Sequence, residues 1–206
     1  MIRQLVFAIM LLSLLFNNGM SQTKFNLSGT IGYFAPLGDW QKHMYAEGVN
    51  QFQGGYSMFP EAELKFKDVA LSVIFNYSKM SATDWEEFVS EEGADIIVSA
   101  SQSQIGGVVK YYFVNSQPHL FDFEAGAVYL FLKGTEQFHS YSYEYDFLNS
   151  GFAILSGLGY QFSLNDRLSI ILPIRVLWRP EGIQFSDGRS LDIFGLYITP
   201  GLKFIF

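Results

Sequence analysis

Apolar and polar residues alternate along most of the chain that follows residue 22. A period of two places every second side chain on the same face of an extended strand, so the pattern predicts β-strands with one apolar face. We identify eight such segments of roughly ten residues each. None has a charged residue on its apolar face. These faces fall in the ranges 25–33, 56–66, 69–77, 105–113, 121–131, 152–162, 168–178 and 194–206.

The positions between the apolar residues hold the charges, which we expect to face the lumen of a barrel. The candidate lumen charges are Glu61, Glu63, Lys65, Lys110, Asp122, Glu124, Arg175, Arg179 and Lys203. A register shift of one residue turns these side chains toward lipid if the apolar faces lie in a bilayer. Each Lys or Arg at the bilayer midplane costs about 2–4 kcal/mol, so the register is strongly specified.

The connections between the segments alternate in length. Short polar turns occur at 67–68, 115–118 and 163–166, and longer connections span 36–53, 80–104, 134–150 and 179–190. Short turns at one end and long loops at the other are typical of outer-membrane barrels. The sequence predicts an all-β fold, an eight-stranded antiparallel up-and-down transmembrane β-barrel in the cell outer membrane, with both termini periplasmic. The alternative is a soluble lipocalin-like barrel, whose apolar face points inward.

Aromatic residues gather near both ends of the predicted strands and indicate two interfacial girdles. One girdle comprises Phe66, Phe113, Phe121, Phe162 and Phe206, near the short turns, and the other comprises Tyr33, Tyr56, Tyr77, Tyr129, Phe152 and Trp178. Pro60, Pro173 and Pro200 fall inside predicted strands, although a closed barrel has no free edge to hold them. We expect β-bulges or locally missing ladder hydrogen bonds at these prolines.

The first residues have the charged, apolar and small-residue order of a secretory signal peptide. Arg3 precedes an apolar run over 5–16, and Gly19 and Ser21 occupy the small positions of a cleavage site. We therefore expect residues 1–21 to be a cleaved signal peptide and residues 22–206 to be one barrel domain. An uncleaved anchor is the alternative, but the run is short for a spanning helix.

Composition supports an exported membrane protein. Hydrophobic residues make up 49% of the chain and aromatic residues 17%, but charged residues only 16%, and there is no cysteine. The formal net charge of −7 becomes more acidic if Arg3 is removed with the leader. Nucleic-acid phosphates bind basic surfaces, and this chain is acidic, so we expect no nucleic-acid partner.

The mature chain resembles the small OmpA/OmpX/OmpW-like barrels, and more closely the PorT-like proteins with an outer membrane protein beta-barrel domain. The alternating C-terminus carries this resemblance most specifically: Ile198, Pro200, Leu202, Phe204 and the terminal Phe206. The resemblance implies that the barrel-assembly machinery reads Ile198, Leu202, Phe204 and Phe206 as an assembly signal. It also implies contact with outer-membrane lipid and lipopolysaccharide, but no single activity.

Three features admit a functional or a purely structural interpretation. The near-balanced lumen charges favour a paired plug over a narrow polar path, since an eight-stranded lumen is just wide enough for side chains to fill. The acidic stretch Asp84, Glu86, Glu87, Glu91, Glu92 and Asp95 matches no calcium-loop spacing, so a solvated loop is preferred over cation binding. Tyr141, Tyr143 and Tyr145 fit a strand above the membrane better than a ligand surface.

Catalysis has little support in the sequence. A lipid A deacylase site needs a His and a Ser on one face, but Tyr141 stands where His139 requires the Ser. His43 and His119 lie far from it in the predicted topology, and no phosphate loop, dinucleotide fingerprint or zinc spacing occurs. We therefore expect no enzyme, no cofactor and no metal site.

The function that we predict is an integral outer-membrane barrel with a side-chain-filled lumen. It anchors extracellular loops for a structural, surface-interaction or secretion-accessory role, with an extracellular ligand or protein as a possible partner of the long loops. The alternatives are a narrow pore for small or hydrophobic solutes and a lipid-modifying outer-membrane enzyme.

Overall fold

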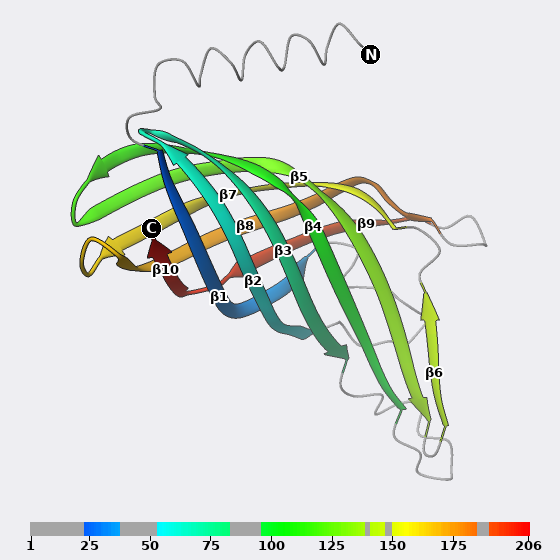
Figure 1. The fold of residues 1–206 in the computed structure, drawn as a ribbon. Helices are drawn as coiled ribbons and strands as arrows, with labels where there is room; N and C mark the ends of the chain where they lie inside the picture. Colours follow the sequence, from blue (N-terminus) through cyan, green and yellow to red (C-terminus); the bar gives the residue numbers. More distant parts are fainter. Residues whose placement is uncertain (1–22, 38–52, 83–95, 139–140, 147–149, 185–189) are drawn as a thin grey trace, which may run out of the picture.

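The strands of the protein curl into a single closed antiparallel sheet (Figure 1). The computed structural model describes residues 23–37, 53–82, 96–138, 141–146, 150–184 and 190–206. The strands are β1 (Thr23–Leu37), β2 (Gln53–Phe66), β3 (Val69–Ala82), β4 (Ile96–Ser116), β5 (His119–Phe138), β6 (Tyr141–Asp146), β7 (Gly151–Ser163), β8 (Leu168–Gln184), β9 (Ser190–Ile198) and β10 (Gly201–Ile205).

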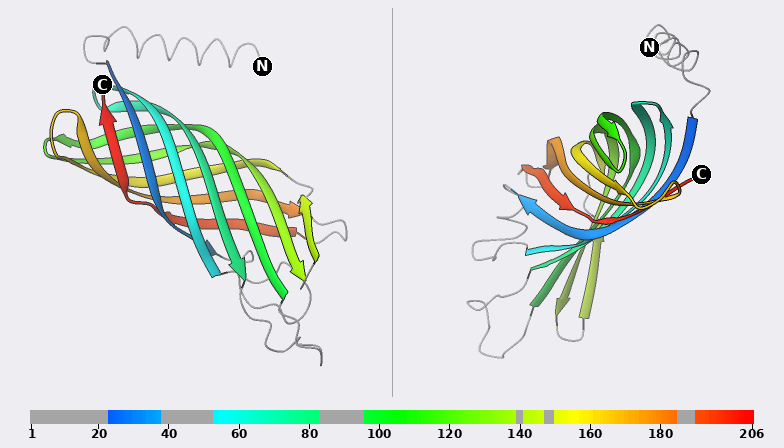
Figure 2. Two further views of the ribbon diagram at one scale, coloured as in Figure 1. Left: turned by 60° about the horizontal axis from the view of Figure 1, so that its bottom comes forward. Right: turned by 90° about the vertical axis from the view of Figure 1, so that its left-hand side faces the viewer.

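These ten strands form the eight continuous strands of the barrel wall, which we call staves. β9 and β10 are two pieces of one stave, since both pair with β8 and with β1, and β6 only extends β5 at one end. The pairing of β1 with β9 and β10 closes the sheet. The predicted eight-stranded antiparallel barrel is confirmed. Figure 2 shows the tilted staves from two sides.

The stagger of the barrel follows from the pairing register. Paired residues run from Leu27 around the sheet through Ala62, Val73, Gly107, Ala127, Ile154, Trp178 and Phe194 to Leu37, which is ten residues beyond the start on β1. A stagger of ten over eight strands sets a tilt of about 40° and a backbone radius of about 8 Å. Because ten is even, the inner and outer faces keep their identity around the whole circuit.

The exposed face is apolar, as the alternation predicts. Ile31, Val73 and Leu158 are 64%, 62% and 58% exposed, whereas Glu63, Glu124 and Arg175 are each 1% exposed. This orientation is the reverse of a lipocalin-like barrel. Where one strand carries a member of each aromatic girdle, the two lie eight to ten positions apart: Phe66 and Tyr56, Phe121 and Tyr129, and Phe162 and Phe152. At this tilt the separation is about 20–25 Å, which matches the apolar band of outer-membrane barrels.

The three internal prolines interrupt the ladder without changing its register. The sequence of pairs between β2 and β3 skips Phe59 and Pro60 but resumes at Glu61 in the same register. Thr199 and Pro200 separate β9 from β10, and the register with β1 is the same on both sides of this break. Pro173 lies opposite the break, where its carbonyl accepts a hydrogen bond from the Thr199 backbone N–H at 3.3 Å. The prolines therefore cause missing ladder bonds, one of the two predicted outcomes, and not bulges.

The strands at the loop end are longer than the sequence pattern predicts. We call the end with the turns at 67–68, 117–118 and 164–167 the turn end, and the opposite end the loop end. β4 begins at Ile96 and β5 ends at Phe138, so the predicted connections at 80–104 and 134–150 are too long. β8 also continues to Gln184. Backbone pairing continues there although the apolar–polar alternation has stopped, which is why the pattern misses it.

β6 is a further departure from the predicted 134–150 loop. Its backbone pairs with β5 from Lys133↔Asp146 to Phe138↔Tyr141, which agrees with the strand interpretation of Tyr141, Tyr143 and Tyr145. The predicted signal peptide, the acidic stretch in 84–95, His43 and His139 lie outside the described residues. Within the described part of the chain, no helix is long and apolar enough to cross a membrane.

The parity of the strands is testable with site-directed labels, because the chain has no native cysteine. A nitroxide on Val73→Cys should show high oxygen and low nickel-chelate accessibility in lipid vesicles, since this side chain points into the acyl region. A nitroxide on the turn variant Asp166→Cys should show the reverse. A water-exposed spectrum at position 73 in a folded barrel would contradict the register.

Candidate functional site

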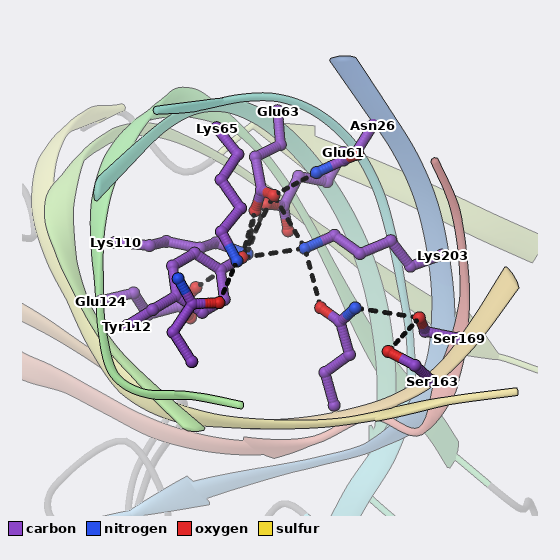
Figure 3. A network of polar contacts seen from close by, with 12 residues as sticks. Asn26, Glu61, Glu63, Lys65, Lys110, Tyr112, Glu124, Ser163, Ser169 and Lys203 are labelled. Atoms are coloured by element: carbon purple, nitrogen blue, oxygen red, sulfur yellow. Dashed lines mark hydrogen bonds and ion pairs between the residues drawn. The ribbon is translucent and has the colours of Figure 1, made fainter. Parts of the chain in front are cut away.

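The turn-end half of the lumen contains a network of buried charged side chains. Its members come from β2, β4, β5, β8 and β10. Figure 3 shows that the members from β2, β4, β5 and β10 point into the barrel interior. The network consists of Glu61, Glu63, Lys110, Tyr112, Glu124, Arg175 and Lys203. Each of these side chains occupies an inward position of its strand, so the same alternation that exposes apolar residues also brings them together.

Lys110 lies at the centre of three carboxylates. Its Nζ is 2.5 Å from Glu61 Oε1, 3.4 Å from Glu63 Oε2 and 3.5 Å from Glu124 Oε2. Lys110 and Glu124 are direct neighbours in the β4–β5 register, whereas the two other glutamates come from β2, which β3 separates from β4. The single ammonium therefore neutralises part of the charge of carboxylates from two staves.

Arg175 spans the other side of the same carboxylates. Its Nη2 donates to Glu61 Oε2 at 2.8 Å and to Glu124 Oε2 at 3.1 Å, and its Nε donates to Glu124 Oε1. Arg175 and Glu124 form the two-pronged contact that suits a planar guanidinium. Because a buried charge is costly unless it is paired and hydrogen-bonded, these contacts make the charged lumen compatible with a stable barrel.

Toward the turn end, the network continues through Lys203 and Tyr112. Lys203 Nζ is 2.8 Å from Glu63 Oε1 and donates to the Tyr112 hydroxyl at 2.9 Å. Tyr112 donates to Glu63 at 3.0 Å, and Asn26 Nδ2 donates to the same carboxylate at 2.6 Å. Glu63 thus receives donors from four side chains when Lys110 is included, and it is the most densely coordinated carboxylate of the network.

Two glycines of β7 leave room for the carboxylates of β5. A Cβ on Gly159 would overlap the Asp122 carboxylate, and a Cβ on Gly157 would crowd Glu124. Asp122 is buried but makes no ion pair within the described residues, and it lines a cavity of about 20 Å³ together with Gly159, Arg175 and Lys203. This volume is enough for about one water molecule, so the lumen at this level is almost completely filled.

The loop-end half of the lumen contains a large apolar cluster beside buried polar residues such as Asn76, Gln102 and Gln104, and the sequence analysis did not predict this cluster. The cluster consists of Phe34, Phe59, Ile74, Met80, Val108, Val128, Leu130, Leu132, Ala153, Leu155, Leu177 and Tyr197. The rings of Phe34 and Phe59 pack on Tyr197 with centroids 4.6 and 5.0 Å away, and the Arg175 guanidinium lies 4.7 Å from the Phe59 ring. The apolar cluster and the ion network are therefore stacked in direct contact.

The sequence contains a signal for this cluster. Alternation fails in runs such as Val128-Tyr129-Leu130-Phe131-Leu132, where both faces of the strand are apolar. Such a run indicates burial on both sides. The sequence analysis named the inward charges but did not identify this apolar cluster.

The predicted lumen charges divide into three groups in the structure. Glu61, Glu63, Lys110, Glu124, Arg175 and Lys203 join the network, and Asp122 lies beside it. Lys65 lies nearer the turn end and is only half-buried, and Arg179 lies toward the loop end beside Gly151. The predicted assembly residues Ile198, Leu202, Phe204 and Phe206 all face outward. No group of residues suited to a metal ion occurs in the described ranges.

Comparison with known proteins shows which solved structures share this fold. No protein-family model matches this sequence, and no curated protein matches it. The solved structure of Neisserial surface protein A (NspA) superposes with a TM-score of 0.56 at 11% identity, over 90% of this chain and 99% of that chain. The chain has the fold of the small outer-membrane β-barrels.

Two further solved structures agree. A major outer membrane protein from Thermus thermophilus superposes with a TM-score of 0.58 at 11% identity, over 89% of this chain and 99% of that chain. The outer membrane protein OprG from Pseudomonas aeruginosa gives 0.56 at 10% identity, over 89% and 95%. At such identities the barrel shares architecture with these proteins, and architecture does not fix activity.

Removing one cation from the network should be far more damaging than removing a surface cation. We expect Arg175→Met to lower the unfolding free energy by about 3–5 kcal/mol, because it leaves two buried carboxylates short of a partner. The turn variant Arg167→Met should change it by less than about 0.5 kcal/mol. Urea unfolding in lipid vesicles, followed by tryptophan fluorescence, measures both. Equal unfolding free energies for the two variants would show that Arg175 does not stabilise the barrel through this network.

Proposed function

We propose that the protein is an integral outer-membrane protein whose barrel is a closed, rigid anchor for the segments at its loop end. The turn end and both termini lie in the periplasm in this proposal, and the loop end faces the exterior. Outward apolar side chains between two aromatic girdles support membrane insertion, as do the solved outer-membrane barrels of the same fold.

The filled lumen is the observation that carries the anchor function. Arg175 links Glu61 on β2 to Glu124 on β5 across the barrel, and its guanidinium packs on Phe59. Phe59 in turn packs on Tyr197, whose hydroxyl accepts hydrogen bonds from Gln102 and Gln104. A solute that crosses this lumen has to separate paired charges and an apolar cluster in succession. A filled lumen therefore supports a structural role over a pore.

The shape of the loop end indicates where specific contacts are made. β4 and β5 remain paired as far as Ile96↔Phe138, and β6 adds a third strand to this extension. In Figure 1 these three strands reach farther at the loop end than the rest of the sheet. Such a projecting ribbon presents residues beyond a lipid surface, so we assign surface interaction to this side of the barrel.

Partners follow from this arrangement as further parts of the proposal. Outer-membrane lipid and lipopolysaccharide contact the apolar belt and the loop end, and the barrel-assembly machinery reads the outward residues Ile198, Leu202, Phe204 and Phe206. Solved barrels of the same fold include the attachment invasion locus protein of Yersinia pestis, determined in complex with a heparin analogue (TM-score 0.52, 10% identity). A surface-contact role is compatible with that example. Catalysis forms no part of the proposal.

Planar-bilayer recordings test the closed lumen. The purified barrel should insert without producing stepwise conductance, because the ion network and the apolar cluster occlude the lumen. Insertion is verified separately by heat-modifiable migration on a gel, which reports a closed barrel, and by fractionation with the outer membrane. Reproducible conductance steps would replace the anchor with a pore. Fractionation of the mature protein without detergent as a soluble species would remove the membrane assignment itself.

A further inference from the structure

A second cavity opens at the turn end of the lumen, between the ion network and the rim. Its volume is about 70 Å³, and its polar lining includes Lys24, Lys65, Asn115, Gln117 and Ser163. We call it the mouth cavity. A volume of this size accepts several water molecules or a single group of about five non-hydrogen atoms. It is too small for a nucleotide or a sugar chain.

Two lysines line this cavity from neighbouring strands. Lys24 on β1 and Lys65 on β2 are direct partners in the antiparallel register, and both occupy inward positions. Like charges that lie directly opposite on neighbouring strands destabilise the pair. The arrangement is therefore unfavourable unless an anion lies between or beside the two ammonium groups.

No carboxylate of the described residues lies in contact with either lysine. Within the described residues, neither Lys24 nor Lys65 forms an ion pair with a carboxylate. The Lys65 ammonium donates to Asn115 Oδ1 at 3.0 Å and lies 3.7 Å from the centre of the Tyr112 ring. These contacts hold Lys65 in place at the cavity. Glu63 and Asp122 attract its ammonium through space, but neither forms an ion pair with it.

The acidic groups deeper in the lumen do not line the mouth cavity. Glu63 is the carboxylate adjacent to Lys65 on the inner face of β2, and it pairs with Lys203 at 2.8 Å and Lys110 at 3.4 Å. Asp122 lines the smaller cavity beside the network and not the mouth cavity. Lys24 and Lys65 are therefore the charged side chains among the residues that line the mouth cavity, and this lining contains no carboxylate.

The geometry points to a binding site for a small oxyanion, a phosphate or carboxylate group, held between Lys24 and Lys65 in the mouth cavity. Charge-assisted hydrogen bonds from ammonium groups to such oxygens are among the stronger polar contacts in proteins. The amide of Gln117 and the hydroxyl of Ser163 add polar lining of the kind that orients an anion. The ligand comes either from solution at the turn end or from the headgroup of a neighbouring lipid.

Titration with inorganic phosphate tests the site. The purified barrel is kept in a phosphate-free nonionic detergent at constant ionic strength, and binding is measured by isothermal calorimetry and by ³¹P line broadening. Wild-type protein should show saturable binding. The double variant Lys24→Met/Lys65→Met should raise the Kd by about tenfold or more, because both charged donors are lost.

The control is Lys67→Met, which removes a turn lysine whose side chain is 79% exposed. This variant should bind phosphate like the wild type. Heat-modifiable migration shows that each variant has folded, and the single variant Lys24→Met, at an exposed position, serves if the double variant fails to fold. Absence of saturable binding, or an equal loss in Lys67→Met, would overturn the site.

Nanodiscs separate the two sources of the anion. In discs of phosphatidylglycerol, a lipid headgroup that fills the site should lower the apparent affinity for phosphate, whereas discs of a phosphate-free glycolipid should leave it unchanged. If both discs give the affinity seen in detergent, the site is filled from solution. Either result keeps the oxyanion site and assigns its ligand to one source.

Discussion

Backbone hydrogen bonding in a medium without water is the constraint on which the structure depends. Every amide group in the hydrocarbon region must find a partner within the protein, and a sheet meets this demand only if its first and last strands pair. Closure here takes place with a stagger of ten residues. With eight strands, this stagger sets the tilt and the radius of the barrel. Because it is even, inner and outer side chains stay on separate faces. The stagger therefore determines which residues contact lipid and which fill the lumen.

The lumen is narrow, and it is filled in two layers. Near the turn end the filling is ionic, with Lys110 and Arg175 shared among carboxylates of different strands. Near the loop end an apolar cluster surrounds Tyr197, whose hydroxyl accepts hydrogen bonds from Gln102 and Gln104. Glycines on β7 provide the space that the β5 carboxylates require. The contact between Arg175 and Phe59 joins the layers. A barrel filled in this way resists deformation, which suits an anchor whose contacts are made at one end.

Much of this fold follows from the parity of residues along the strands. Val73, Ile174 and Glu124 lie on the faces that alternation assigns to them, since one buried charge in the wrong register costs as much as several correct contacts gain. Parity places Arg175 and Glu61 inside, counting from the short turns places both near mid-height, and the pairing register then brings them into contact. The apolar cluster of the lumen was missed because an inward Leu130 and an outward Phe131 look alike in sequence, and β6 was missed because its pairing lies beyond the periodic segment.

The ion network also bears on the order in which the barrel is built. Arg175 and Glu61 are 114 residues apart in the chain, and they become neighbours only when the sheet has curled. An incomplete sheet therefore holds opposite charges on separate staves, where each needs water. Formation of the salt links and exclusion of water from the interior are then a single late event. A strand that detaches from the closed barrel must expose these charged groups again, which raises the barrier to unfolding.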